Sequence, residues 1–170
     1  LARGRAERLQ SAFPLAVEAL AEAGPDLAGA FLDADRLASL AAGHPGCSPG
    51  ALSWLRGAAS RRRRESAAPF NQQGLFEQYA RVLELISRQR PLLMVLDDLQ
   101  WADRDSLALL FHLGRRLDRT RALIVVAYRP EDLARPAAGG RPALEGILAE
   151  LMRQSDESRI LIGDEPDRIF

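Results

Sequence analysis

The sequence contains no lysine, and all 23 of its basic residues are arginine. A phosphate-binding P-loop of the form GxxxxGK[ST] needs its lysine to reach the β- and γ-phosphates of a nucleotide. Schiff-base chemistry also requires a lysine amine. Neither chemistry can therefore be complete within these 170 residues.

Cysteine, histidine and long apolar runs are also scarce. The single cysteine, Cys47, excludes an intrachain disulfide, and its Gly/Pro-rich surroundings favour a small filler side chain over a reactive thiol. His44 and His112 lack metal-ligand spacing, so we expect them to be structural or solvent-facing. No apolar run approaches the roughly 18 residues that cross a bilayer, and residues 1–10 contain no signal-peptide core. We therefore expect a soluble, cytoplasmic protein without membrane contact.

The remaining composition is typical of a globular domain. Hydrophobic residues make up 47% of the chain, and 23 basic residues balance 23 acidic ones. A net charge of zero creates no overall field that would attract nucleic acid or an anionic membrane. The four arginines at 61–64 are a local exception, but without interleaved aromatic residues they favour a solvated loop over a DNA-binding site.

The order of periodic and apolar segments predicts an α/β fold. From residue 71 onward, amphipathic helical stretches alternate with short apolar stretches. The apolar stretches at 92–96 and 122–128 lack polar alternation, which predicts parallel strands buried on both faces. A third strand is expected at 159–162. The sequence therefore predicts a three-layer α/β unit.

Capping residues predict where several helices begin. Pro14 suits a first helical turn, Ser48 an N-cap before a proline, and Asp103 an N-cap after the first predicted strand. The expected helices run from Pro14 to Gly24, through 26–42 in one or two pieces, and over 51–60, 71–89, 104–119 and 142–152.

Two acids and an arginine follow the two clearest strands. Asp97 and Asp98 come directly after the first strand, and Arg129 follows the second. Ligands of open parallel sheets bind outside the carboxyl ends of the strands, so we expect the three side chains to share one rim. Such a set suits a phosphorylated ligand with magnesium. Asp97 would hold the metal or its water, Asp98 would orient or deprotonate an attacking water, and Arg129 would stabilise developing charge. Alternatively, the two acids only open a turn and cap the next helix.

These residues carry a resemblance to a known family. VLDDLQWAD at 95–103 and VVAYRP at 125–130 resemble the Walker B and sensor-1 region of AAA-type ATPase domains of the STAND class, as found in large LuxR-type transcriptional regulators. The resemblance implies an incomplete P-loop NTPase-like domain over residues 1–162, without the first strand and the P-loop. A divergent tail covers 163–170.

The resemblance also implies roles for particular residues. Asp97 corresponds to the Walker B aspartate, Asp98 to the catalytic acid and Arg129 to the sensor-1 arginine. Trp101, Ala102 and Asp103 match the family pattern after the strand, and we expect no role for them beyond packing and capping. Asp98 is shorter than the glutamate common at its position in AAA proteins, which argues against efficient hydrolysis.

The implied function is that of an ATP-binding regulatory switch, with magnesium as cofactor. Its partners would be ATP or ADP, regulatory or output domains of the same polypeptide, and other copies in a homo-oligomer. Direct DNA contact would belong to a separate output domain. Because the family's P-loop lies upstream of the matching segment, we expect this chain alone to be inactive as an ATPase. The alternative is a nucleotide-independent interaction module or a truncated ATPase fragment.

Overall fold

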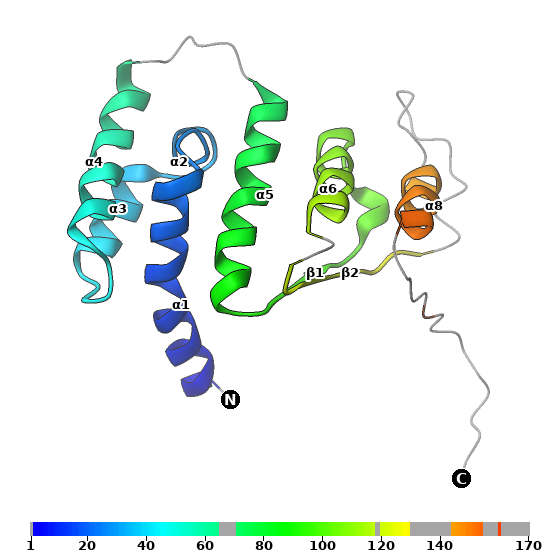
Figure 1. The fold of residues 1–170 in the computed structure, drawn as a ribbon, viewed down its shortest axis with the longest axis horizontal. Coiled ribbons are helices and arrows are strands. Elements are labelled where there is room, and N and C mark those ends of the chain that lie inside the picture. Colours follow the sequence, from blue (N-terminus) through cyan, green and yellow to red (C-terminus); the bar gives the residue numbers. More distant parts are fainter. Residues whose placement is uncertain (1, 65–70, 118–119, 130–143, 155–159, 161–170) are drawn as a thin grey trace.

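The computed structural model describes residues 2–64, 71–117, 120–129, 144–154 and 160. Within these residues, several helices accompany a two-stranded parallel sheet (Figure 1). No helix among them is long and apolar enough to cross a membrane. The elements are α1 (Ala2–Ala23), α2 (Leu27–Ala30), α3 (Ala34–Ala42), α4 (Pro49–Arg64), α5 (Gln72–Gln89), β1 (Leu92–Leu96), the 3-10 turn η1 (Leu99–Trp101), α6 (Arg104–Arg116), β2 (Ala122–Val126) and α8 (Leu144–Gln154).

The first part of the chain is a helical group with a small apolar core. Its fully buried centre is formed by Val17 of α1 and Leu55 of α4, with alanines of α3 and α4 around them. Alanine side chains allow close approach of the helices, which supports tight packing here. Ser48 accepts the N–H of Ala51 at 3.1 Å, so the predicted N-cap of α4 is confirmed.

Two helices are longer than their sequence signals predict. Helix α1 begins at Ala2, so Pro14 lies inside it rather than at its start. Residues 2–10 are mostly Ala, Arg, Glu, Leu and Gln, which are strong helix formers and continue the helix although proline removes one hydrogen bond. Helix α4 continues through Arg64, so the arginine run at 61–64 is helical and not a loop.

Helix α5 joins the helical group to the sheet (Figure 1). Asn71 caps it by accepting the N–H of Gly74 at 3.1 Å, and Leu75 and Val82 are buried against α1 and α2. On its other side α5 packs against α6, where Oε2 of Glu77 lies 3.4 Å from Nη2 of Arg116. The predicted amphipathic helix is therefore confirmed, and its two apolar sides serve two different cores.

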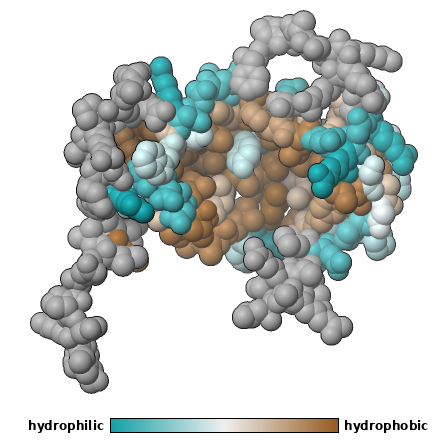
Figure 2. All heavy atoms as spheres, turned by 180° about the vertical axis from the view of Figure 1, so that it is seen from behind, coloured by the Kyte–Doolittle hydropathy of each residue, from teal (hydrophilic) through white to brown (hydrophobic). Residues whose placement is uncertain are grey.

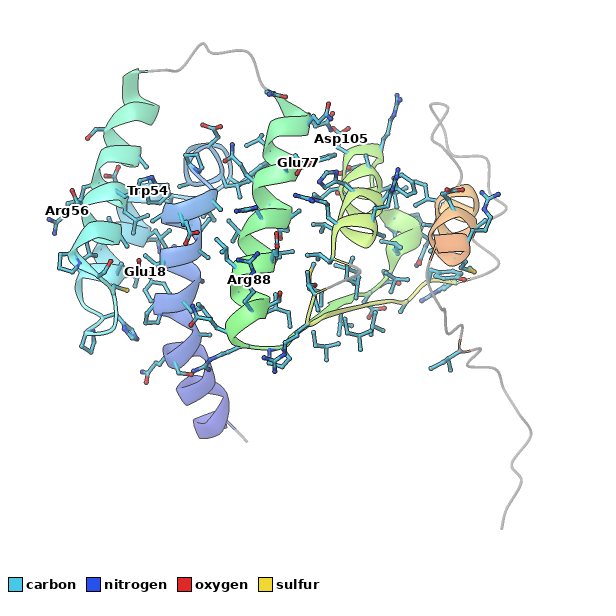
Figure 3. The ribbon with its side chains drawn as sticks, in the orientation of Figure 1. Glu18, Trp54, Arg56, Glu77, Arg88 and Asp105 are labelled. Atoms are coloured by element: carbon cyan, nitrogen blue, oxygen red, sulfur yellow. The ribbon has the colours of Figure 1, made fainter. Side chains whose placement is uncertain are left out.

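Strands β1 and β2 are parallel neighbours, in register from Leu92 opposite Ala122 to Leu96 opposite Val126. Side chains project to both sides of the strands (Figure 3). One face of the sheet packs against α5, α6 and α8, with Leu96, Ile124 and Val126 in contact with the buried leucines of α6 and α8. This part of the fold is a layer of helices on a parallel sheet, as an α/β chain requires.

The other face of the sheet is exposed, so the prediction of strands buried on both faces is wrong for the described residues. Its apolar side chains are Leu93, Val95, Leu123 and Val125, which are 65%, 61%, 60% and 42% exposed. Seen from behind, hydrophobic residues reach the surface over the middle of the molecule (Figure 2). An unbroken apolar run shows that both faces suit burial, but does not show whether a second layer of helices is present. The third strand expected at 159–162 lies outside the described residues, apart from Ile160, which is in no strand.

Candidate functional site

The parallel pairing brings the ends of β1 and β2 to the same rim of the sheet. Backbone bonding continues past the strands, because Ala127 donates to the Leu96 carbonyl at 2.8 Å and Leu99 donates to the Ala127 carbonyl at 3.0 Å. The turn after β1 is therefore fastened to the chain that leaves β2. Asp97, Asp98 and Arg129 lie at this junction, and all three are exposed.

Asp98 turns the chain from the strand into η1. Its φ of 54° and ψ of 40° are left-handed, and no other non-glycine residue in the described part of the chain has a positive φ. Aspartate tolerates this region better than most residues because its short polar side chain can bond locally. The Asp98 N–H donates to Oδ1 of Asp97 at 2.9 Å. The two carboxylates are thus presented on a fixed, exposed turn.

Gln100 connects the two strand ends through its side chain. Its Nε2 donates to Oδ1 of Asp98 at 2.8 Å, and its Oε1 accepts the backbone N–H of Arg129 at 3.4 Å. The sequence patterns that point to Asp97, Asp98 and Arg129 do not point to Gln100. The available signal was chemical, because an amide beside two acids can donate to a carboxylate and accept from a backbone N–H at once.

The acids do not act as helix caps. Asp98 precedes η1 without a side-chain capping bond, and α6 is capped by Asp103, whose Oδ1 accepts the Ser106 N–H at 2.7 Å. The predicted cap at Asp103 is therefore confirmed. Of the turn-and-cap alternative, the turn is present at Asp98, whereas neither Asp97 nor Asp98 caps a helix. Trp101 is 69% exposed, so the packing role expected for it is wrong.

The donor set fits part of a magnesium site. Magnesium prefers oxygen ligands and keeps several waters, and one or two carboxylates plus substrate phosphates commonly hold it. Asp97 and Asp98 supply two exposed carboxylates. No group of three or more His, Cys, Asp or Glu side chains that could bind a metal occurs in the described residues, so waters and phosphates would complete the shell. Arg129 forms no ion pair with either acid.

The model of the AAA ATPase domain family matches residues 1–126. The chain belongs to this family. The match runs from α1 to the end of β2 and includes Asp97 and Asp98, whereas Arg129 lies just beyond it. Searches of curated proteins and of solved structures gave no match to the chain. Family membership supports an ATPase-like module, with nucleotide and commonly magnesium as its ligands.

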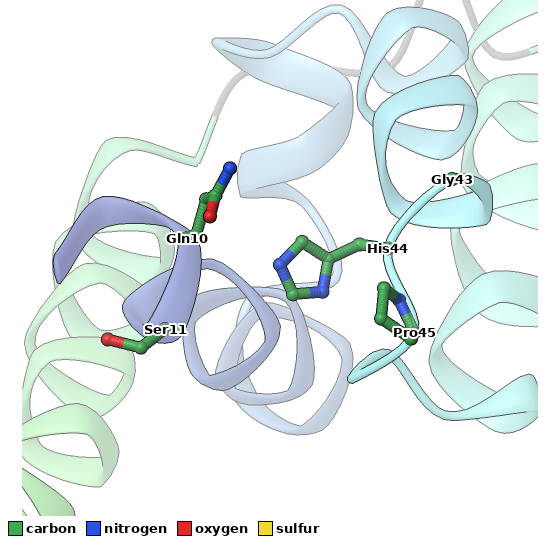
Figure 4. Close-up of a pocket in the computed structure, with 5 residues that line it drawn as sticks. All are labelled: Gln10, Ser11, Gly43, His44 and Pro45. Atoms are coloured by element: carbon green, nitrogen blue, oxygen red, sulfur yellow. The ribbon is translucent and has the colours of Figure 1, made fainter. Parts of the chain in front are cut away.

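A hollow of this AAA domain lies between α1 and the loop that precedes α4. It has a volume of about 490 Å³ and is lined by Gln10, Ser11, Gly43, His44 and Pro45 (Figure 4). Nδ1 of His44 accepts the Gly46 N–H at 3.2 Å, and its ring lies 5.6 Å from that of Phe13. These contacts fix the loop before α4 and give His44 a structural role, as the sequence predicts.

His112 and Cys47 of the AAA domain are each partly buried among neighbouring helices. His112 lies between α5 and α6, 6.0 Å from the Phe76 ring, with its Nε2 buried 3.6 Å from Oε1 of Glu77. The His112 side chain is thus partly buried, although it lies on the polar side of α6, and its contacts are structural. Desolvation, and then the charge of Glu18, raise the pKa of the half-buried Cys47 thiol. A raised pKa disfavours the thiolate, which agrees with an inert filler role.

Proposed function

We propose that this AAA domain is part of an ATP-binding switch that uses magnesium and controls a signalling or transcriptional output attached to it. One observation carries the proposal: the bonded junction of β1 and β2 places Asp97, Asp98 and Arg129 at one rim. Membership of the AAA ATPase domain family supports nucleotide as the ligand. The carboxyl ends of parallel strands are where α/β proteins bind such ligands.

Each rim residue has a distinct role in the proposed site. Asp97 holds magnesium or a water bound to it, with one carboxylate oxygen already fixed by the Asp98 N–H. Asp98 orients or deprotonates the water that attacks the terminal phosphate. Arg129 stabilises the negative charge that develops on that phosphate. Bound magnesium would neutralise phosphate charge, and the short side chain of Asp98 favours slow hydrolysis over rapid turnover.

The phosphate-binding lysine has to come from outside these 170 residues, because the sequence has none. Separately, the exposed sheet face supports a further segment packed on this sheet. Strands of a parallel sheet are normally covered on both sides, yet Leu93, Val95 and Leu123 are at least 60% exposed. We propose that the segment carrying the P-loop adds to this sheet and completes both the core and the nucleotide site.

The test compares ATP and magnesium binding by two polypeptides. The 170-residue chain should show no micromolar affinity by calorimetry, whereas a longer polypeptide that contains GxxxxGK[ST] ahead of Leu1 should bind. In the longer form, Asp97→Asn should weaken binding of ATP with magnesium by roughly tenfold or more, as loss of metal-site contacts does. Asp105→Asn is the matched control, since Asp105 is an exposed aspartate in the first turn of α6.

Two results would contradict the proposal in different ways. Micromolar binding by the short chain would show that phosphate is held without a lysine. No binding by a longer form that contains the motif would favour the second candidate function, a nucleotide-independent interaction module. The exposed apolar sheet face is the observation that favours this second candidate.

A further inference from the structure

We infer that Gln100 is a positioning residue that holds the Asp98 carboxylate and the Arg129 backbone as one unit. This inference rests on the function proposed for those two residues. Gln100 is the central link in a chain of hydrogen bonds from one strand end to the other. In this series of hydrogen bonds, the Asp98 N–H donates to the Asp97 carboxylate and the Gln100 NH₂ group donates to the Asp98 carboxylate. The Gln100 amide oxygen then accepts the Arg129 N–H.

The chemistry of its neighbours fixes the orientation of the Gln100 amide. When ionised, the Asp98 carboxylate has no proton to donate and can only accept hydrogen bonds, so it must face the NH₂ group of Gln100. The Arg129 backbone N–H can only donate, so it must face the amide oxygen. A flipped amide would set oxygen against carboxylate and NH₂ against N–H. Of the uncharged side chains of this length, glutamine alone offers both a donor and an acceptor.

The backbone on which Gln100 stands is anchored on both sides. Leu99 is 7% exposed, packs into the core beneath α6 and α8, and donates to the Ala127 carbonyl. Trp101 donates to the Asp98 carbonyl at 3.0 Å, which closes the turn around Gln100. The half-buried Gln100 side chain therefore leaves a rigid base, and its two bonds are directional.

This arrangement has a consequence for the proposed nucleotide site. Gln100 occupies one oxygen of the Asp98 carboxylate and so selects one rotamer, which leaves the second oxygen for water or metal. The same amide holds the backbone of Arg129 beside that carboxylate. A displacement of Asp98 by a ligand would thus be transmitted to the Arg129 backbone, although the two residues belong to different strands.

Two substitutions in the 170-residue chain separate the two bonds. Gln100→Leu removes both the donor and the acceptor, whereas Gln100→Glu keeps an acceptor for Arg129 but places a second carboxylate against Asp98. Gln73→Leu is the control, because Gln73 is an exposed glutamine on α5. NMR reports the amide exchange rate of Arg129 and the rotamer of Asp98, the latter from its side-chain coupling constants. Mn²⁺, added alone, probes metal contact by broadening the Asp97 and Asp98 amides.

The expected pattern differs between the variants. Gln100→Leu should speed Arg129 exchange about threefold, because it removes one long hydrogen bond of 3.4 Å. It should also let the Asp98 carboxylate sample several rotamers and weaken Mn²⁺ binding about threefold. Gln100→Glu should retain Arg129 protection while the Asp98 rotamer is lost. Exchange of the Leu99 amide should stay unchanged, whereas a general loss of stability would speed exchange at both amides. The thermal midpoint should fall by no more than about 2–4 °C, the shift that the loss of an ordinary hydrogen bond produces in a domain of this size.

The outcomes distinguish this inference from the function on which it rests. Unchanged Arg129 exchange and unchanged Asp98 couplings in Gln100→Leu would overturn the positioning role, whatever the metal does. If both change as expected but Mn²⁺ reaches neither acid in any variant, the proposed metal site fails and the link between the strand ends stands.

Discussion

At the scale of single residues, the site depends on one unusual backbone conformation. Asp98 turns the chain at φ 54°, which costs about 1–2 kcal/mol for a residue with a Cβ. The turn brings Gln100 within reach of the next strand end. Because the two acids directly follow an apolar run, the sequence predicts that they lie at the end of a strand. It does not predict the left-handed turn, because aspartate is common in many kinds of turn.

Replacement of Asp98 should reveal this conformation in the free energy of unfolding. Asp98→Ala should be less stable than Asp98→Gly by about 1 kcal/mol, because alanine is strained in the left-handed region and glycine is not. Asp98→Asn should lie close to wild type. Urea unfolding measures the order. At Asp105, which is helical, the order of alanine and glycine should reverse. An Asp98→Ala variant that is more stable than Asp98→Gly would contradict the left-handed conformation.

At the scale of elements, sequence patterns predict the parts with strong periodicity and clear caps. Helices α5 and α6 follow from apolar spacing, with the α6 cap at Asp103, and the strands follow from their apolar runs. The extents of α1 and α4 do not follow from these patterns. Helix formers before Pro14 extend α1 toward the N-terminus, and the arginine run extends α4 to Arg64. The rim could be predicted from strand ends, but the Gln100 bond to Arg129 depends on tertiary register between distant residues.

The N-cap of α6 should contribute measurably to stability. Asp103→Ala removes the acceptor for the Ser106 N–H and should lower the free energy of unfolding by about 1 kcal/mol. Asp103→Ser restores an N-cap oxygen and should recover most of that loss. Thermal and urea unfolding of the three proteins give the comparison. Equal stability of the alanine variant and wild type would show that the cap bond contributes nothing.

At the scale of the whole molecule, the described helices cover only one face of the sheet. The uncovered face combines four apolar side chains from two adjacent strands, so it is a contiguous patch and not a scatter of single residues. Such patches on soluble domains mark interfaces or incomplete cores. Here the patch adjoins the rim of Asp97, Asp98 and Arg129, where we propose that a nucleotide binds, so one added segment would complete both features.

The apolar patch should bind a dye whose fluorescence rises in apolar surroundings. The chain should bind 1-anilinonaphthalene-8-sulfonate, and replacement of Val95 and Leu123 by threonine should remove most of the fluorescence, because threonine keeps strand propensity but reduces apolar area. Leu40→Thr should change it little, since Leu40 is 57% exposed on α3, away from the sheet. A longer polypeptide that contains the P-loop should bind little dye, because its added segment covers this face. Equal fluorescence of the short and long forms would show that the segment with the P-loop leaves the sheet face bare, and the sheet and the nucleotide site would then be completed separately.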